Sequence, residues 1–492
     1  MFEKVFPFNR DFNQLDWKRV LFVIFCVTLI VRFPFFFRDY VDRDESTFIL
    51  LGQSWADGFL PYTQLWDLKP PITFGFFAVI ISLFGKSFIA IRFFGSLLVV
   101  GTALCTYFIS KRMTSPKTAF WVAIGTVVFL SLFGSLQGVM SEHISIFFFT
   151  LGITFLVLRT SFLNYFLVGL FFGLAIMAKL NMAYPALFVG LYLGWAFVRA
   201  RKLSSGFMKL VLIALGVFLI VGLTALPYYS QGNFDLWFSS VFEAPLAYSN
   251  AKHHSATSTL PIFLLVGLLF FLGYWKKLLP KTDCRVTLLV VTSLGVLLSF
   301  MQAGKINGHY LIQFYPFVLV LLGIVFEKLP RLNKKFYPIL LLLLFVPMES
   351  YLEYANIIKN KSAKGSFFNG EGIDIPNYLK AEKLDDKSIF FTEYHIGYWL
   401  LDKKSPTVAS THPSNVTREE LFPFMRNSRD TAQEELEYIT GTVRPELIVA
   451  RKNRSVFDGR RRELNKHIDS ILKVDYKLIQ TIDKGLIYQK IN

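Results

Sequence analysis

The sequence predicts a polytopic α-helical membrane protein of about eleven spans, with a small C-terminal external α/β domain. Hydrophobic residues make up 53% of the 492-residue chain and charged residues only 18%. A soluble protein normally carries about 25% charged residues, and so apolar a chain could not cover its own surface in water. The apolar residues gather in long runs before residue 350, whereas the remainder of the chain is more polar.

Eleven apolar runs are candidate membrane spans, because a helix needs about 20 apolar residues to cross the hydrocarbon core. The first run, 20–37, lacks a small-residue cleavage site, so we expect a true span and no cleaved signal peptide. The other runs cover 93–110, 118–136, 144–158, 162–178, 182–198, 207–226, 260–274, 286–301, 311–326 and 336–347.

The net charge of +17 comes largely from basic clusters beside these runs. The clusters stand at alternate ends of successive spans, at 18–19, 111–117, 159, 199–202, 276–281 and 328–335. Cytoplasmic loops of membrane proteins are enriched in Lys and Arg, so this placement indicates anionic lipid headgroups rather than nucleic acid as the partner. We therefore predict a cytoplasmic N-terminus and an external C-terminal domain.

The short apolar run 71–85 decides how the first loop is read. Counting it as a span would move every later basic cluster to the outside, against the positive-inside rule. We therefore predict a helix that lies on, or dips into, the outer membrane face. Residues 38–92 then form one external loop of the membrane domain 1–350, and its many aromatic residues favour a folded cap.

Residues 351–492 read as a separate external α/β domain. Short runs of β-branched and aromatic residues alternate there with charged, helix-prone stretches. The strands are expected at 388–392, 407–409, 446–450, 476–482 and 486–491, and the helices at 418–427 and 431–439.

Ionisable residues near membrane depth are costly, and each is therefore a functional hypothesis. On the predicted topology the unusual ones fall on the external face. Lysine and arginine there could equally extend to the interface as simple anchors, and Glu45 could cap a helix. The candidate site residues are Asp44, Glu45 and Lys69 in the first loop, and Arg92, Glu142, Lys179, Lys305, His309 and Tyr310 at the ends of later spans.

The first loop resembles that of the GT-C glycosyltransferases. Asp44-Glu45, followed by the segments 58–62 (Gly-Phe-Leu-Pro-Tyr) and 65–71 (Leu-Trp-Asp-Leu-Lys-Pro-Pro), is similar to the loop of the protein O-mannosyltransferase-like and lipid A aminoarabinose transferase families. Weaker similarities are Arg92, the stretch that ends in Lys179, and the aromatic and proline segment 308–316. The resemblance covers residues 20–320 or so, and the C-terminal part is similar to that of bacterial members.

The resemblance implies transfer of one sugar from a polyprenyl-phosphate carrier to an acceptor hydroxyl, with inversion at the anomeric carbon, on the external face of a bacterial inner membrane. Asp44 would be the base, and Glu45 would orient the acceptor or adjust the acidity of Asp44. The phosphate is a good leaving group, so cations that hold it complete the chemistry. Lys69, Arg92, Lys179 and Lys305 are the clamp candidates, with His309 as a hydrogen-bond donor and Glu142 and Tyr310 as further substrate contacts.

Several alternatives remain open at this stage. Asp42-Arg43-Asp44 matches a metal-binding D-x-D pattern, which is common by chance, so a divalent metal cofactor stays undecided. The three cysteines, Cys26, Cys105 and Cys284, are too far apart to indicate a disulfide framework or metal motif. A lipid or solute transporter, or flippase, would also carry ionisable groups in a helical bundle, although no inverted repeats are evident. The sequence names neither the sugar nor the acceptor, which could be a lipid, a glycan or a protein.

Overall fold

The computed structural model describes residues 16–39, 42–132, 134–159, 161–251, 256–303, 306–329 and 346–491. The chain divides into two compact units, each assembled from three segments. We call Met1–Phe36, Ile91–Leu226 and Lys252–Glu353 the helical unit. Phe37–Ala90, Pro227–Ala251 and Tyr354–Asn492 form the mixed unit. The division of the chain at residue 350 made from the sequence stays a prediction.

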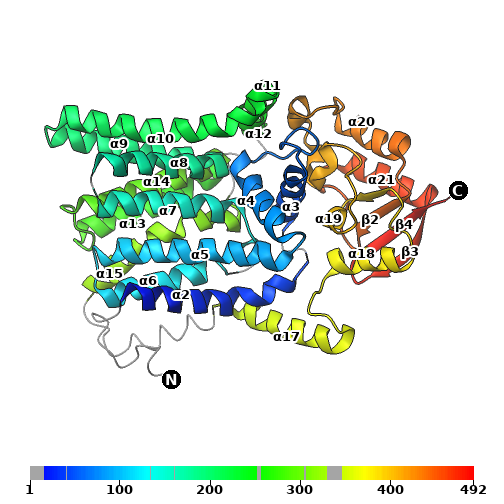
Figure 1. Cartoon of the computed structure of the whole chain (residues 1–492), viewed down its shortest axis with the longest axis horizontal. Helices are drawn as coiled ribbons and strands as arrows, with labels where there is room; N and C mark the ends of the chain where they lie inside the picture. The colour runs from blue at the N-terminus through cyan, green and yellow to red at the C-terminus, as the bar shows by residue number, and fades with distance from the viewer. Residues whose placement is uncertain are drawn as a thin grey trace. The chain divides into compact units, whose positions relative to one another are not determined.

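The helical unit is built from long apolar helices that lie side by side (Figure 1). Within the described residues, seven helical segments are long and apolar enough to cross a membrane, and α6 and α8 are shorter apolar helices. The helices are α2 (Trp17–Arg32), α5 (Phe88–Lys111), α6 (Pro116–Phe129), α7 (Ser141–Leu158), α8 (Phe162–Ala178), α9 (Ala183–Arg199), α10 (Leu203–Ser230), α13 (Leu260–Trp275), α14 (Cys284–Ala303) and α15 (Tyr315–Lys328).

Ten of the eleven predicted runs coincide with helices, and the protein is a multi-pass membrane protein. Two predicted boundaries are wrong. Run 118–136 ends as a helix at Phe129, with Leu130 as its C-cap, and Gly134, with a positive φ of 52°, begins a separate short 3-10 turn. The run predicted from 311 becomes α-helical only at Tyr315, next to Pro316, which suits a first helical turn. The run 336–347 lies almost entirely outside the described residues.

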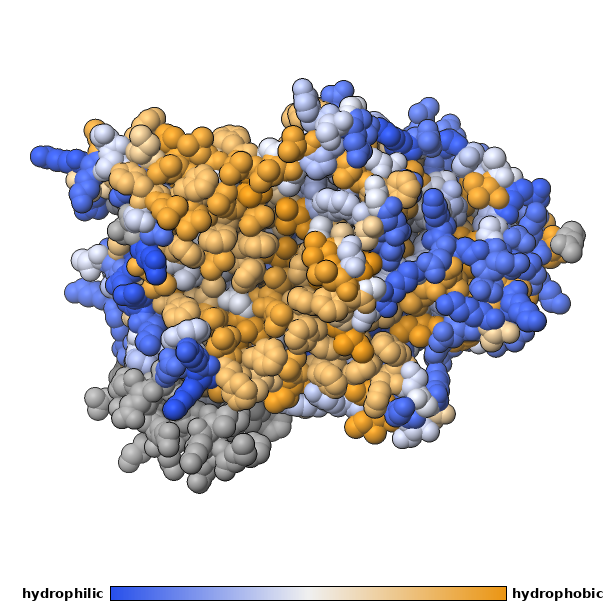
Figure 2. Space-filling view, in the orientation of Figure 1, coloured by the Kyte–Doolittle hydropathy of each residue, from blue (hydrophilic) through white to orange (hydrophobic). Residues whose placement is uncertain are grey.

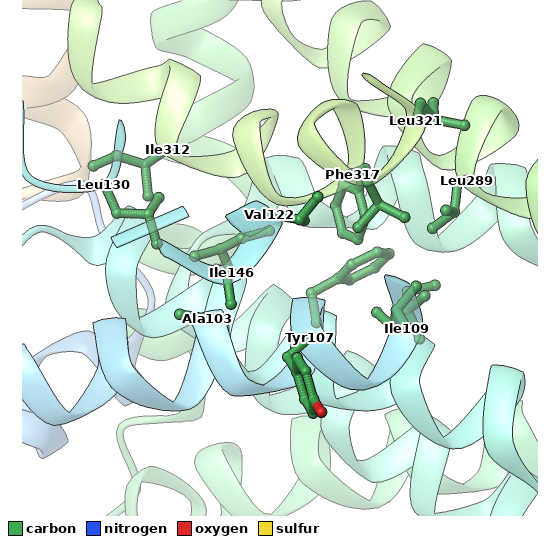
Figure 3. Close-up of a cluster of buried hydrophobic side chains, with 14 of the residues drawn as sticks. Ala103, Tyr107, Ile109, Val122, Leu130, Ile146, Leu289, Ile312, Phe317 and Leu321 are labelled. Atoms are coloured by element: carbon green, nitrogen blue, oxygen red, sulfur yellow. The ribbon is translucent and has the colours of Figure 1, made fainter. Parts of the chain in front are cut away.

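A continuous apolar core holds the helices together. Phe149 and Phe172 stack with ring centroids 4.4 Å apart, and Figure 3 shows neighbouring core residues such as Ile146 and Phe317. The outer helices differ, since only 11% of the most apolar window of α10 or of α13 is buried. Apolar side chains also cover much of the visible surface of the helical unit (Figure 2). Such a surface suits lipid, because water would penalise so large an exposed apolar area.

Successive helices of the helical unit run in opposite directions. The C-terminal ends of every second helix therefore lie at the same end of the unit. The C-terminal ends of α13 and α15 meet, and Lys328 Nζ donates to the Lys277 carbonyl at 3.3 Å. The basic clusters flank these ends and the corresponding ends of the neighbouring helices. Glu142 begins α7 and Lys179 follows α8, so these two residues belong to the opposite end of the helical unit.

The mixed unit contains two helices of the first loop, two short helices from 227–251, and the C-terminal segment. Helices α3 and α4 pack together through rings such as Phe48 and Phe77, whose centroids are 5.9 Å apart. The helix α4 is the one expected from run 71–85, and its position at the membrane face stays a prediction. The helices are α3 (Arg43–Ala56), α4 (Pro71–Phe84), α11 (Phe234–Phe238), α12 (Ala244–Asn250), α17 (Met348–Lys364), α18 (Glu371–Ala381), α19 (Gly397–Leu400), α20 (Ala432–Glu437) and α21 (Arg462–Val474).

The C-terminal segment contains a four-stranded sheet of order β1-β2-β4-β3. Strand β1 pairs with β2 in parallel, and β4 pairs antiparallel with both β2 and β3. The sheet therefore matches the predicted small α/β part, with strands β1 (Ile389–Phe391), β2 (Leu447–Arg451), β3 (Tyr476–Ile482) and β4 (Gly485–Lys490).

Two local predictions in this segment are wrong. Residues 407–409 form no strand, because the chain turns at the 3-10 segment Ala409–Thr411, where the Ser410 hydroxyl bonds back to Thr407. Residues 418–427 form a 3-10 segment, Glu419–Phe424, rather than an α-helix, since Pro423 lacks the N–H that an α-helix needs.

Candidate active site

Asp44 lies at the N-terminal end of α3, within the loop that the sequence predicts for it. The Asp42 side chain caps the helix by accepting a hydrogen bond from the Asp44 backbone N–H at 2.8 Å. Asp44 and Glu45 occupy the first turn, where the helix dipole stabilises negative charge. Asp42 is therefore a standard N-cap, and it fixes the backbone position of Asp44.

Lys69 contacts Asp44, so the structure brings together two residues that the sequence placed in one site. Lys69 Nζ lies 3.4 Å from Asp44 Oδ2 and 3.9 Å from Asp67 Oδ2. The Tyr62 hydroxyl donates to the Lys69 carbonyl at 2.5 Å, and the lysine ammonium lies 5.5 Å from the centre of the Phe48 ring. Desolvation by burial raises the pKa of Tyr62 well above its usual range, which keeps its hydroxyl protonated as a donor. The loop between α3 and α4 thus holds Lys69 beside the carboxylate.

The C-terminal segment contributes the second contact to Asp44, which the sequence did not indicate. His412 Nε2 lies 3.3 Å from Asp44 Oδ1. Its other ring nitrogen, Nδ1, accepts a hydrogen bond from the Ser414 backbone N–H at 3.1 Å. His412 follows a short 3-10 segment and belongs to no recognisable motif, so only the fold could identify it.

Glu45 differs from its neighbour because its side chain is buried inside the mixed unit. Its predicted role toward the acceptor stays a prediction. Asp42, the first member of the D-x-D pattern, is occupied as the helix cap, and Asp44 faces a lysine and a histidine rather than other acids. In the described part of the chain, no three His, Cys, Asp or Glu side chains gather to hold a metal ion. These residues do not fit a metal site.

A second polar cluster lies in the helical unit and contains four of the predicted residues. Glu142 Oε1 pairs with Lys179 Nζ and lies 3.7 Å from His309 Nε2. The Lys179 ammonium lies 4.3 Å from the centre of the Tyr310 ring, which stacks on Phe300. The start of α7, the end of α8 and the 3-10 segment Gly308–Gln313 provide these side chains.

Two predicted residues, Arg92 and Lys305, belong to neither of these clusters as described. Arg92 is buried in the helical unit, and its guanidinium donates to the Phe35 carbonyl at 2.6 Å. Its predicted phosphate contact stays a prediction. Lys305 lies outside the described residues.

Arg32 is a buried structural residue that the sequence interpretation missed. Its guanidinium donates to the carbonyls of Leu136, Gln137 and Gly138, at 2.7, 3.1 and 2.7 Å. These bonds close the turn between α6 and α7, and α7 presents Glu142. An arginine inside an apolar run was the available signal, because an unpaired charge there would be very costly.

Comparison with known proteins adds a sequence match and a shared fold. Residues 68–225 match the family described as dolichyl-phosphate-mannose-protein mannosyltransferase. The matched range includes Lys69, Arg92, Glu142 and Lys179 and begins after Asp44. An uncharacterized protein of Aquifex aeolicus (strain VF5) is 25% identical over 265 residues, which are 53% of this chain and 60% of that relative. The chain therefore matches less than two thirds of that relative's length.

Solved structures share the fold at low sequence identity. ArnT from Cupriavidus metallidurans, bound to undecaprenyl phosphate, is 12% identical and superimposes over 96% of this chain and 97% of its own, with a TM-score of 0.60. The oligosaccharyltransferase AglB of Archaeoglobus fulgidus, in complex with an inhibitory peptide and a dolichol-phosphate, is 11% identical, with a TM-score of 0.50 over 89% of this chain and 70% of its own. The chain therefore has a segment similar to that mannosyltransferase family and shares the fold of ArnT and AglB.

Proposed function

We propose that the protein transfers a single sugar from a polyprenyl-phosphate donor to an acceptor hydroxyl on the external membrane face, with Asp44 as the base and with inversion at the anomeric carbon. The observation that carries this proposal is the position of Asp44, which is partly exposed, lies at a helix N-terminus and pairs with Lys69. A partly exposed carboxylate can meet a substrate hydroxyl, whereas a fully buried one cannot.

The reaction needs one proton acceptor and one stabilised leaving group. The acceptor oxygen attacks the anomeric carbon as Asp44 takes its proton, and the bond between that carbon and the phosphate oxygen breaks. The electron pair leaves with the polyprenyl phosphate, so no general acid is needed on that oxygen. Proton transfer to a positioned base contributes about 10²–10⁴-fold to such reactions.

Lys179 and Lys69 are the proposed cations for the donor phosphate. Lys179 lies at one end of the helical unit, where Glu142 holds it until an anion competes for it. Lys69 carries its charge beside the base, where the departing phosphate and the attacking hydroxyl would meet. The ArnT structure that shares this fold holds undecaprenyl phosphate, and AglB holds a dolichol-phosphate, which supports a lipid-phosphate donor here.

The test is transfer by the purified full-length protein in detergent. Undecaprenyl phosphates that carry radiolabelled hexoses or N-acetylhexosamines serve as donors, and bacterial membrane extracts serve as acceptors. We expect label in a lipid, glycan or protein product whose anomeric configuration, read by NMR, is opposite to that of the donor. Retained configuration would contradict the proposed displacement. Movement of the carrier across vesicles without any transfer would instead support a flippase.

The proposed orientation places the basic end of the helical unit in the cytoplasm and the C-terminal segment outside the inner membrane. The chain offers a matched pair of thiols for testing it. Cys284 is exposed at the start of α14, beside basic residues, and Gly459 has open space for a side chain. A membrane-impermeant maleimide should label Gly459→Cys in spheroplasts and Cys284 only after permeabilisation. The reverse pattern would overturn the orientation.

A further inference from the structure

The N-terminal end of α3 is fixed by side chains from the C-terminal segment of the mixed unit. Arg43 Nε donates to Glu393 Oε1 at 3.3 Å, and a second nitrogen of the same guanidinium contacts Glu393 Oε2. One turn later, the Thr47 hydroxyl lies 2.9 Å from His395 Nε2. These two contacts hold the backbone that carries Asp44, but neither touches its carboxylate.

His412 makes the third contact, and this one reaches the reacting group. The His412 side chain is 6% exposed, and its Nδ1 is occupied as an acceptor for the Ser414 N–H. A neutral imidazole whose Nδ1 accepts a hydrogen bond carries its proton on Nε2. Nε2 is the nitrogen that lies 3.3 Å from Asp44 Oδ1, so the ring presents an N–H to the carboxylate.

The Asp44 carboxylate is therefore held from two sides. Lys69 contacts Oδ2 and His412 contacts Oδ1. A carboxylate has about four lone-pair positions, so its oxygens can accept from several donors at once. Two fixed partners also restrict rotation of the side chain, which is how a base is kept within reach of its proton.

We infer that the C-terminal segment completes the catalytic centre, with His412 as a positioning residue that orients Asp44; this inference rests on the proposed function. The positioning role explains why a histidine from a sheet-containing segment lies at the start of a helix in the first loop. It also assigns a chemical function to the C-terminal segment, which would otherwise be read only as an acceptor-binding or stabilising part.

The test compares His412→Ala and His412→Gln with Thr47→Val in the full-length protein, using the radiolabelled undecaprenyl-phosphate sugars described above. Gln retains an N–H near the position of Nε2, whereas Ala does not. Thr47→Val removes a neighbouring contact between α3 and the C-terminal segment and leaves Asp44 untouched. Thermal melting in detergent reports whether each variant folds.

We expect His412→Ala to lower kcat by about 10- to 100-fold, the cost of a misplaced reacting group, with little change in the KM for the donor. Loss of an N–H donor favours the protonated carboxyl, so the acid limb of the kcat profile should move to higher pH. The charged or titratable groups near Asp44 are Asp42, Arg43, Glu45, Asp67, Lys69, Glu393, His395, His412 and, through Glu393, Arg454. His412→Gln should retain most of the activity, and Thr47→Val should keep the wild-type pH profile.

Two results would overturn the inference while leaving the proposed function intact. The first is wild-type kcat and pH profile in folded His412→Ala, while Asp44→Asn is inactive. The second is an equal loss in His412→Ala and Thr47→Val with no shift of the acid limb, which indicates a purely structural contact. Should His412→Ala fail to fold, a folded His412→Gln whose kcat falls about 10-fold or more would also contradict it, because Gln keeps the N–H. Absence of transfer by the wild-type protein with every donor would remove the proposed function and this inference together.

Discussion

The two polar clusters of the molecule hold their charges in different ways. In the mixed unit, the Asp44 and Lys69 side chains are 28% and 20% exposed, and their closest atoms are 3.4 Å apart. In the helical unit, the Glu142 and Lys179 side chains are 1% and 11% exposed and form a close ion pair. The first pair is loose and accessible, as a base that must meet a substrate requires. The second is a closed, buried pair.

On the proposed function, this difference would suit two different roles. A base acts on a group that arrives with the substrate, so its oxygens must be positioned yet open. A buried lysine that binds a lipid phosphate needs a carboxylate partner while the phosphate is absent, because an unpaired buried charge is strongly destabilising. The predictions below test whether each cluster works in the way that its exposure indicates.

The largest stability effect is expected from Glu142→Gln. The variant leaves the Lys179 ammonium without its carboxylate, and removal of one partner of a buried pair costs about 3–5 kcal/mol in the free energy of unfolding. The double variant with Lys179→Met should recover most of this loss, because neither charge remains. Thermal and denaturant unfolding in detergent measure both, and additive losses in the double variant would show that the two side chains do not stabilise each other.

Glu142→Gln also sharpens the assignment of Lys179. If Lys179 holds the donor phosphate, added undecaprenyl phosphate should raise the Tm of this variant more than that of the wild type, since the phosphate replaces the missing carboxylate. Equal shifts in the two proteins would remove Lys179 from the phosphate site.

The next effect is expected from Lys69→Ala. Loss of one cation that stabilises developing charge costs about 10²-fold in transfer, and donor use should suffer more than acceptor use. Lys86 of the same unit is a matched control, because it donates to the Trp399 carbonyl and pairs with Asp402 instead of Asp44. Lys86→Ala should keep wild-type kinetics. An unchanged donor KM and kcat in Lys69→Ala would contradict its role.

The smallest effect is a pH dependence of stability. Burial, with the neighbouring His412 and Arg43, holds the pKa of His395 well below its usual value near 6.5. The folded protein therefore keeps His395 neutral, while the unfolded chain takes up a proton as the pH falls below about 6.5. This site should lower the free energy of unfolding by up to about 1.4 kcal/mol per pH unit below that value, and contribute no slope above it. Melting curves between pH 5 and 8 measure the slope, which His395→Gln should reduce; an unchanged slope in that variant would place its origin elsewhere.

Much of the fold was predictable because apolar runs and basic flanks follow from the bilayer itself. Strands such as β3 also followed from local composition. The wrong predictions share one physical cause, which is that turns depend on single residues. A 3-10 turn that begins at Gly134 replaced the end of the run predicted for α6, and Pro423 excluded an α-helix, although the surrounding residues favoured helix.

The candidate site was predictable only in part. Asp44 and Lys69 share one loop, so a local pattern could connect them. His412 reaches Asp44 only through the tertiary fold of the mixed unit, and no local pattern marks it. The sequence shows Arg32 inside an apolar run, but its backbone partners could be identified only once the turn after α6 was known.

The central claim is that Asp44 removes the acceptor's proton, and a single-turnover comparison of the wild type with Asp44→Asn tests it most directly. Both proteins are first saturated with radiolabelled undecaprenyl-phosphate sugar, and donor binding is measured before the acceptor is added. We predict equal donor binding and a transfer rate that falls by about 10²–10⁴-fold in the variant, because an amide cannot take up the proton. A folded Asp44→Asn protein that transfers sugar at the wild-type rate would contradict the assignment.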